Sequence, residues 1–396
     1  MRWKTSALIS SRLGRNDRLN SVPARTTADA SVRFHLQTGL SAEELGLLWR
    51  DLEARADITF FLSWDWMGAW IAELETKPLV LVGEAGGALV LLALLVPRLR
   101  REAAGAIRVR GLHLHATGRE EIDVIAHEYN GFLVDRAWAG RADAAATAWL
   151  LGQRVGPHRF DELHIKDVVA EQAPVLTPPG ALARELSRKP SWRVDLDAVR
   201  TGGTAYLDTL SANTRQQIRR AMRLYEERGA LRAERAPDAP TALAWLDALA
   251  ALHQRHWEAR GKPGGFAFPF FVRFQRRLVG ACVPRGTAEI VRVSAGAQPI
   301  GYVYNLILRG HVLAFVTGFV AEGDGRLKPG LVSHALCIQR HLAEGARLYD
   351  FMAGAYRYKA SLGQPGAELV YVQMQRRTAM TTFEQAARRV WERVRG

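Results

Sequence analysis

The sequence is poor in cysteine and contains no apolar run long enough to cross a membrane. Only Cys282 and Cys337 are present, far apart, and no CxxC pair occurs. This usage is typical of a reducing compartment in which both thiols are buried, and it argues against a cysteine zinc site or a redox motif. The longest apolar run, ALVLLALLV, has nine residues, whereas a transmembrane helix needs about 20.

Several catalytic motifs are also missing. The chain has no GxSxG, HExxH or Walker A motif, and no GxGxxG with a following acid. Hydrolase, zincin, NTPase and dinucleotide-binding interpretations therefore lack support. His253 and His256 have the i, i+3 spacing of a ligand pair, but no third ligand is in view, and we expect no metal.

Acidic residues are outnumbered by basic ones. The 396 residues include 54 Lys and Arg against 40 Asp and Glu, a formal net charge of +14. Such a surface favours polyanions such as nucleic acid, a phosphate-rich cofactor or an anionic membrane face, without choosing among them. Residues 1–30 are rich in Arg and Ser and lack the apolar segment of a secretory signal. We expect a disordered basic tail there, followed by a cytoplasmic protein without membrane insertion.

Apolar periodicity and turn residues predict a mixed α/β chain. Expected helices and strands occur in the same order in each half of the chain. In the first half these are helices over 41–56 and 60–74, a hairpin over 78–101 and a strand over 160–168. In the second half these are helices over 211–229 and 241–261, a three-strand meander over 289–320, a helix over 331–345 and a final strand over 347–353.

The two halves resemble each other in pattern. Each half contains a strand, a small glycine turn and a longer strand after a pair of expected helices. The segment is VLVGEAGGALVLLALLV in the first half and IVRVSAGAQPIGYVYNLIL in the second. The length alone favours two domains, at about 150 residues per domain. We therefore expect a tandem duplication of one α/β unit, with domains at 31–185 and 186–396 and the active site in the second.

The helix expected over 211–228 is the most basic part of the chain. Arg215, Arg219 and Arg223 lie one turn apart on one face, and no acid occurs from Ser211 to Tyr225. Like charges at this spacing repel by a few tenths of a kcal/mol per pair, which an anionic partner would offset. The face is either an anion-binding surface or an ordinary solvated basic face.

A second anion-binding candidate precedes the helix over 331–345. Arg326, Lys328 and Gly330 lead into its start at Leu331. A helix N-terminus can bind phosphate through its free N–H groups, and glycine allows the backbone to approach a ligand closely. This loop is our candidate pyrophosphate site, although a Pro-Gly turn before a helix would look the same.

The stretch GARLYDFMAGAYRYKASLGQPG carries the candidate catalytic residues of the second half. Asp350 lies on the expected strand and is a base or a salt-bridge partner, while Gly354 permits a sharp exit. Tyr358 could give a proton to a leaving group, and Lys359 could neutralise developing charge. The alternative for Lys359 is a surface lysine.

Further candidates lie outside that stretch. Glu128 belongs to the polar cluster His127-Glu128-Tyr129-Asn130 after IDVIA, where an acid could deprotonate an amine. His256 and Trp257 close the helix over 241–261, and Tyr304 lies in the meander. We assign these last three residues, with Arg215 and Arg219, to substrate binding. The choice between Glu128 and Asp350 as the base stays open.

These segments together resemble the GNAT-superfamily acyltransferases of the cellulose-biosynthesis CelD type, relatives of the Fem aminoacyltransferases. The segments that carry the resemblance are FFLSWDWMGAW, NTRQQIRRAMRLYEERG, LHQRHWEARG and the closing block KPGLVSHALCIQRHLAEGARLYDFMAGAYRYKASLG. The closing block is the most specific of them. In Fem-type relatives, the lysine of the closing Y/F-K motif lies near the reacting groups, and Lys359 matches it.

The resemblance implies two tandem GNAT-like domains and metal-free transfer of an acyl group from acyl-CoA to an amine. Such catalysis depends on positioning and on stabilising the oxyanion. The family binds the donor pyrophosphate at a strand–loop–helix junction, commonly R/Q-x-x-G-x-G/A. The matching stretch here, 326–331, departs from that pattern because it has a single glycine.

Three functions remain open at this point. The first is an N-acyltransferase that uses acetyl-CoA or a longer acyl-CoA, with a small molecule or a cell-envelope or polysaccharide precursor as acceptor. The second is a Fem-like transferase that uses aminoacyl-tRNA. The net charge favours this second function, but no long helical hairpin insertion is visible. The third is a non-catalytic scaffold of polysaccharide synthesis, which the departure at 326–331 suggests.

Overall fold

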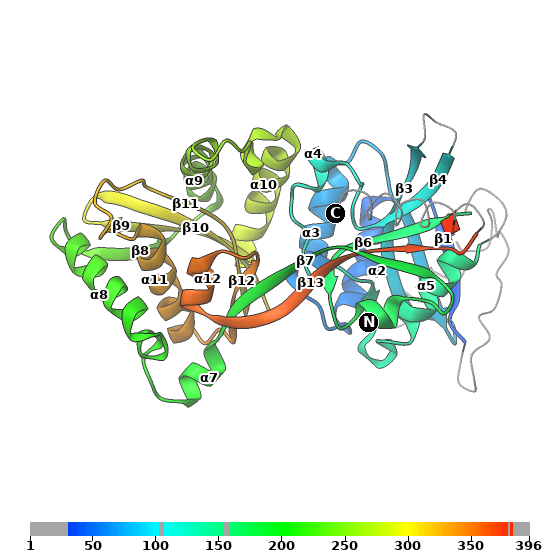
Figure 1. Cartoon of the computed structure of the whole chain (residues 1–396), viewed down its shortest axis with the longest axis horizontal. Helices are drawn as coiled ribbons and strands as arrows, with labels where there is room; N and C mark the ends of the chain where they lie inside the picture. The colour runs from blue at the N-terminus through cyan, green and yellow to red at the C-terminus, as the bar shows by residue number, and fades with distance from the viewer. Residues whose placement is uncertain (1–30, 103–106, 154–158, 379–380, 383–396) are drawn as a thin grey trace, which may run out of the picture.

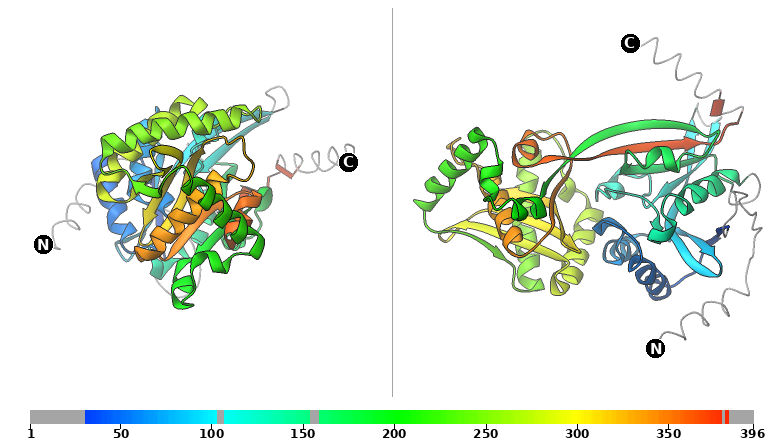
Figure 2. Two further views of the ribbon diagram at one scale, coloured as in Figure 1. Left: turned by 90° about the vertical axis from the view of Figure 1, so that its left-hand side faces the viewer. Right: turned by 90° about the horizontal axis from the view of Figure 1, so that it is seen from below.

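The computed structural model describes residues 31–102, 107–153, 159–378 and 381–382. The expected tail over 1–30 lies outside these residues. Two lobes are joined by two long strands, β7 (Leu182–Asp195) and β13 (Gln364–Gln375), which run side by side from one lobe to the other (Figures 1 and 2). A single 13-stranded sheet has the order β1-β2-β3-β4-β6-β13-β7-β12-β11-β10-β9-β8, with β5 paired to β3.

The two halves contribute the remaining helices and strands. In the first half these are β1 (Arg33–Gln37), α2 (Ala42–Glu53), α3 (Trp64–Glu73), β2 (Leu79–Ala85), β3 (Ala88–Glu102), β4 (Ile107–Leu114), α4 (Glu120–Asp123), β5 (Leu133–Val134), α5 (Ala142–Gly152), β6 (Glu162–Val169) and α6 (Ala173–Leu176). In the second half these are α7 (Leu196–Thr201), α8 (Ala212–Glu226), β8 (Leu231–Arg235), α9 (Ala239–Glu258), α10 (Pro269–Cys282), β9 (Ala288–Ala295), β10 (Gln298–Leu308), β11 (His311–Phe319), α11 (Pro329–Ala343), β12 (Leu348–Ala353) and α12 (Arg357–Leu362).

The strand pairing confirms the internal repeat. In the first half, β1, β2, β3 and β4 pair antiparallel in order, and β4 then pairs parallel with β6. In the second half, β8, β9, β10 and β11 pair antiparallel in the same order, and β11 pairs parallel with β12. The expected fold, two mixed α/β units in tandem, is therefore present, with the two sheets fused through β7 and β13.

Local signals predicted the first elements well. Ser41 caps α2 and forms a capping box with Glu44, an arrangement that satisfies two free N–H groups at the helix start. Ser63 caps α3, which begins at Trp64 after a short 3-10 turn. Gly86 and Gly87 turn the β2–β3 hairpin with positive φ angles of 58° and 83°, as a tight hairpin requires.

The expectation that 347–353 forms the final strand was wrong. The chain continues through α12 into β13, which returns to the first half and pairs with β6 as well as β7. No strand was predicted over β7 or β13. β7 is rich in polar residues and contains Pro190, whereas β13 has Pro365-Gly366 near its start but the apolar run LVYV after them. Proline and glycine weaken a strand assignment from sequence, and the partners are distant in the chain.

An aromatic core joins the two halves. Trp66 of α3 lies edge-on to Phe274 of α10 with ring centres 4.8 Å apart, and edge-on to Phe315 of β11 at 5.6 Å. Figure 1 shows α3 next to α10 at the junction of the lobes. At the same junction, the Arg309 guanidinium donates to the carbonyls of Ala56 and Glu53 at 2.8 and 2.7 Å. Because large aromatic side chains dominate core energetics, the halves pack as one body.

None of the helices in the described residues combines the length and apolarity that a membrane span requires.

A close approach between α9 and β11 gives a test of the packing. A Cβ on Gly318 would lie 2.5 Å from the Leu249 carbonyl oxygen and 3.0 Å from the Leu252 Cβ. We expect Gly318→Ala to lower the free energy of unfolding by about 1–3 kcal/mol, because overpacking displaces backbone. Urea denaturation measures the change. Gly280→Ala in α10 is the control, since nothing lies within 4 Å of a Cβ there. Equal stability of the two variants would contradict this packing.

Candidate active site

The candidate site forms where the parallel pair β11–β12 ends. The last paired residues are Leu313 and Asp350. β12 then bends sharply, because Met352 has a φ of 64° and Gly354 a φ of 135°. A non-glycine residue in this region costs about 1–3 kcal/mol and persists only where its surroundings hold it. One of the contacts that hold the bend is a hydrogen bond from the Gly354 N–H to the Pro190 carbonyl at 2.8 Å.

Asp350 holds this bend together and is buried. Its Oδ1 accepts from the Met352 N–H at 2.6 Å. Its Oδ2 accepts from the Tyr129 hydroxyl at 2.7 Å and lies 3.2 Å from His311 Nε2. Burial, together with the Asp350 charge, raises the pKa of Tyr129 far above its ordinary value, so this tyrosine stays a neutral donor. Both carboxylate oxygens of Asp350 are therefore engaged.

Glu128 reaches the same bend from the first half of the chain. Its Oε2 accepts from the Ala353 N–H at 2.8 Å, and the side chain is buried. Burial raises the pKa of the Glu128 carboxyl to about 7, against the lowering effect of the Ala353 N–H and with a further increase from Asp167. A carboxyl with a pKa near the working pH is well suited to act as a general base.

Lys359 lies in α12 and is 6% exposed. Its ammonium donates to the carbonyls of Ala353 at 2.7 Å and Met352 at 3.2 Å. Burial lowers the pKa of Lys359 to about 8, while Glu128 and Asp350 act in the opposite direction. The alternative of an exposed surface lysine is thus excluded. An ammonium has three donors, so one remains for a substrate.

Tyr358 faces a different neighbour. Its ring stacks on His334 of α11 with centres 5.6 Å apart and planes 17° apart. Burial raises the pKa of Tyr358 above its ordinary value. Burial and the nearby Lys359 lower the pKa of His334 to about 3, so His334 is neutral. The stacked rings of Tyr358 and His334 thus lie near Lys359.

The proposed pyrophosphate loop precedes α11. Arg326 is bound to Asp324, with a shortest distance of 2.6 Å, which offsets part of its charge. Lys328 is the N-cap residue, and no side chain caps the helix. Gly330 lies under the Phe319 ring, 3.1 Å from the position of a Cβ, and Leu331 follows in the first turn. The helix start thus keeps free N–H groups, as an anion site needs.

The remaining predicted residues lie away from the bend. Arg215 and Arg219 on α8 contact Asp208, at 4.0 and 2.9 Å. The acid missing from the helix sequence is therefore supplied just before it. His256 is exposed at the end of α9 beside Trp257, and Tyr304 is fully buried in the core next to Phe315. Within the described part of the chain, none of these side chains forms a hydrogen bond, ion pair or ring contact with Glu128, Asp350 or Lys359.

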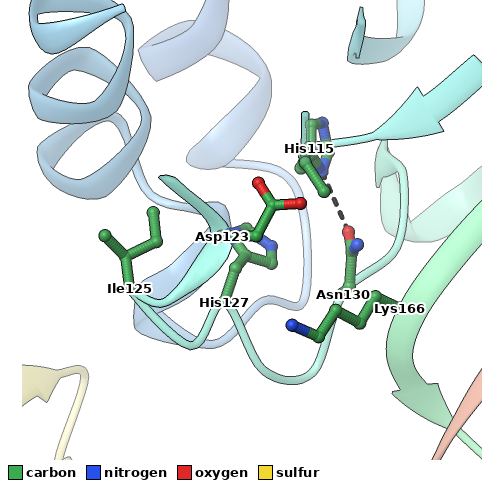
Figure 3. Close-up of a pocket in the computed structure, with 7 residues that line it drawn as sticks. His115, Asp123, Ile125, His127, Asn130 and Lys166 are labelled. Carbon is green, nitrogen blue, oxygen red and sulfur yellow. Dashed lines mark hydrogen bonds between the residues drawn. The ribbon is translucent and has the colours of Figure 1, made fainter. Parts of the chain in front are cut away.

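A pocket lies next to the site on the first-half side. Its lining comes from the residues just after β4, the end of α4, the loop that carries Glu128, and β6, and consists of His115, Ala116, Asp123, Ile125, His127, Asn130 and Lys166 (Figure 3). Of the residues in this region, only the polar cluster 127–130 was predicted from the sequence. His115 and His311 were not, although the alternating histidines of GLHLHATG were a usable signal for His115.

The residues that the structure describes contain no group of three or more His, Cys, Asp or Glu placed to hold a metal. His253, which the sequence paired with His256, lies 3.1 Å from the Thr317 carbonyl oxygen.

Comparisons with known proteins agree with this architecture. Residues 212–360 match the acetyltransferase (GNAT) domain family. This segment contains Asp350, Tyr358 and Lys359, but not Glu128. This similarity to a GNAT acetyltransferase domain lies in the second half of the chain and indicates an acyltransferase. No match was found among curated proteins.

Three solved structures are similar over most of the chain. FemX has a TM-score of 0.55 at 12% identity, covering 89% of this chain and 99% of that one. The C-terminal domain of a "Putative Lysylphosphatidylglycerol Synthetase" from Agrobacterium fabrum has a TM-score of 0.52 at 11% identity, covering 85% and 92%. A tandem GNAT protein from the clavulanic acid biosynthesis pathway has a TM-score of 0.45 at 16% identity, covering 88% and 99%. At such identities, the first two establish a shared fold.

Proposed function

We propose that the protein is an N-acyltransferase that moves an acyl group from an acyl-CoA to an amine. The observation that carries this proposal is that Glu128 and Lys359 both bind Ala353, at the end of the β11–β12 pair. A base and a cation from different halves of the chain face one bent strand end within a GNAT architecture. Transfer by direct attack needs little else beyond positioning.

In the proposed reaction, the amine nitrogen attacks the thioester carbonyl carbon. A C–N bond forms, the C–S bond breaks, and CoA leaves as a thiolate. Glu128 takes the proton that the amine loses, and it is better placed than Asp350, whose two oxygens already accept from Tyr129 and Met352 and lie against His311. Lys359 stabilises the oxyanion through its remaining N–H.

Lys359 also suits the leaving group. A thiol has an ordinary pKa of about 8.5, close to the value of about 8 for Lys359. Proton transfer from the ammonium to the thiolate is therefore nearly balanced. Tyr358 is a weaker acid because burial raises its pKa, and its stacking on His334 suits a packing role. We therefore propose that Lys359, and not Tyr358, donates the proton that the CoA thiolate takes up.

The donor pyrophosphate is proposed to lie at the start of α11. The free N–H groups there and the Lys328 ammonium supply anion contacts without any metal. We expect Lys328→Ala to weaken binding of acetyl-CoA, longer acyl-CoAs and free CoA by about tenfold, as loss of one charged contact does. Calorimetry and thermal shift measure this.

Lys77→Ala, an exposed lysine of the first half, is the matched control for charge. The donor site is misplaced if Lys328→Ala and Lys77→Ala bind every CoA species equally well. A lack of stabilisation of the wild type by any CoA species would remove acyl-CoA as the donor.

The Fem-like alternative keeps the chemistry but takes the acyl group from aminoacyl-tRNA. The net charge of +14 favours it, whereas the contacts of Arg215 and Arg219 with Asp208 leave less free charge on α8. Binding to tRNA would fall steeply with ionic strength, and donor binding that is insensitive to salt would exclude it. For the acceptor, the CelD-type resemblance suggests a cell-envelope or polysaccharide precursor, in a cytoplasmic setting. A silent scaffold would bind no CoA and co-purify with a partner.

A further inference from the structure

Two exposed tyrosines lie next to Lys359. Tyr356 is 49% exposed and Tyr358 is 36% exposed. In the described stretch 196–378 these are the only large apolar side chains with such exposure. Their ring centres are 6.1 Å apart. An exposed apolar patch beside a site commonly marks a surface that binds a ligand, so the two rings are candidates for substrate contact.

The Tyr356 ring is held against the bent end of β12. A Cβ on Gly354 would lie 3.0 Å from Cδ2 and Cε2 of the ring and 3.4 Å from Lys359 Nζ, so the missing side chain leaves the room that the ring occupies. The Lys359 ammonium lies 5.6 Å from the ring centre, within the range of a cation–π contact. Tyr356 is also the N-cap residue of α12, and its carbonyl accepts from the Lys359 N–H at 3.0 Å. The backbone and the ring of Tyr356 are therefore fixed together.

These contacts leave part of the Tyr356 ring open to solvent. They involve ring carbons and the Lys359 ammonium, and in the described part of the chain the Tyr356 hydroxyl has no hydrogen-bond partner. The side chain nevertheless stays half exposed. A ring that is already fixed loses little conformational entropy when a ligand binds, so Tyr356 is pre-organised for stacking.

The two rings have different neighbours. The Tyr358 ring stacks on His334 of α11, the helix at whose start the donor pyrophosphate is proposed to bind, and Figure 1 shows α12 next to α11. Among the described rings, Tyr356 contacts only Tyr358. It lies instead against the residue after Ala353, whose N–H binds Glu128. Because Glu128 is the proposed base for the acceptor amine, this neighbourhood assigns Tyr356 to the acceptor.

The charges around Tyr356 restrict what stacks on it. Lys359 contacts the ring, and Arg357 is exposed and forms no ion pair with an acid of the described residues. The acids that act on Lys359, Glu128 and Asp350, are buried. A further cation at the ring would therefore be repelled, whereas a neutral flat ring gains contact area by offset stacking. An aromatic ring stacks in this way, and a pyranose does so through the C–H groups of one face.

We propose that Tyr356 is a specificity-determining residue for the acceptor, and that the open part of its ring stacks on a neutral ring of that acceptor. This step rests on the proposed function. It restricts the acceptor to an amine carried on a ring, either an amino sugar or an aromatic amine, and disfavours an open-chain amine.

The test uses binding alone, so that its failure is distinct from a failure of acyl transfer. The full chain, with ¹³C-labelled tyrosine rings, is titrated with methyl glucoside or benzyl alcohol as neutral ring probes, without and with free CoA, and with sorbitol as the open-chain control. The signal that is missing from Tyr356→Phe identifies the Tyr356 ring. We expect a saturable shift of that signal with a ring probe and none with sorbitol. Tighter binding of methyl glucoside would indicate an amino sugar as acceptor, and tighter binding of benzyl alcohol an aromatic amine.

Substitutions at position 356 separate stacking from simple apolar contact. Tyr356→Leu keeps an apolar side chain but removes the ring, and it should weaken binding of the ring probe about three- to tenfold, the usual contribution of an aromatic pair. Tyr356→Phe should bind as the wild type does. The probe's own proton signals measure both affinities. Leu99→Ala, at an exposed apolar position of the first half, is the control and should change nothing. Because position 356 is exposed, each variant should fold, which a thermal melt checks.

The proposal is overturned if neither ring probe shifts the Tyr356 signal up to its solubility, if sorbitol binds as well, or if Tyr356→Leu binds the ring probes as the wild type does. An equal loss of affinity for free CoA in Tyr356→Leu would assign the ring to the donor and overturn it too. A failure of the proposed function shows differently, because no CoA species would then stabilise the wild type, whatever the ring probes do.

Discussion

Glu128→Gln should fold and lose about 10²–10⁴-fold in kcat/KM for acyl transfer, the usual contribution of a general base. Glutamine keeps the shape and can still accept from the Ala353 N–H, but it cannot take a proton from the amine. The assay follows amine-dependent release of CoA thiol. Glu171→Gln, an exposed acid on the same half, should behave as the wild type does.

The pH profile separates a base from a structural acid. Glu128 works when ionised, so activity should rise as pH passes through about 7, the raised pKa of its carboxyl. The cation at Lys359 is lost above its pKa of about 8, so activity should fall there. The wild type then has a bell-shaped profile, and Glu128→Gln lacks the rising limb. A rising limb that persists in Glu128→Gln would assign the base elsewhere, with Asp350 as the next candidate.

Lys359→Met should lose about 10²–10³-fold in kcat, the loss seen when one donor to an oxyanion is removed. Methionine fills much of the same space, while the carbonyls of Ala353 and Met352 lose their partner. A thermal melt checks folding, and Lys77→Met is the control for charge. The falling limb of the pH profile should disappear in Lys359→Met. Wild-type turnover by this variant would remove Lys359 from the mechanism.

Glu128→Gln and Lys359→Met also test whether the site needs residues from both halves of the chain. The GNAT match covers 212–360, so the second half alone would bring Asp350 and Lys359 but no Glu128. The Tyr129 hydroxyl and the Glu128 carboxylate both bind the bent end of β12. The first half therefore does more than support the second, because it supplies a proposed catalytic group.

The elements that could be predicted from the sequence depend on neighbours in the chain. The cap at Ser41, the Gly86-Gly87 turn and the helix 211–229 all follow from local rules of capping and periodicity. β7 could not be predicted in the same way, because it is rich in polar residues and its pairing joins residues near 190 to residues near 370. In β13 the run LVYV was a local strand signal that the prediction missed.

The residues of the candidate site likewise fall into those with a local sequence signal and those that depend on distant packing. Asp350 and Lys359 stand in one closing block whose residue pattern was recognisable, and the 127–130 cluster was visible as polar residues after an apolar run. That Glu128 and Lys359 bind the same residue, Ala353, depends on how the lobes pack through Trp66 and Phe274. His311 gave no signal because it acts through Asp350 on another strand.

The most direct measurement is product analysis after the wild type, Glu128→Gln and Lys359→Met are incubated with acetyl-CoA or longer acyl-CoAs and a panel of amines that includes amino sugars and amino alcohols. Mass spectrometry should find an N-acyl product and an equal amount of free CoA with the wild type, and a large loss of both with each variant. Equal product from all three proteins would contradict a site shared by the two halves. No amide from any donor and amine, with transfer from aminoacyl-tRNA instead, would contradict the acyl-CoA account.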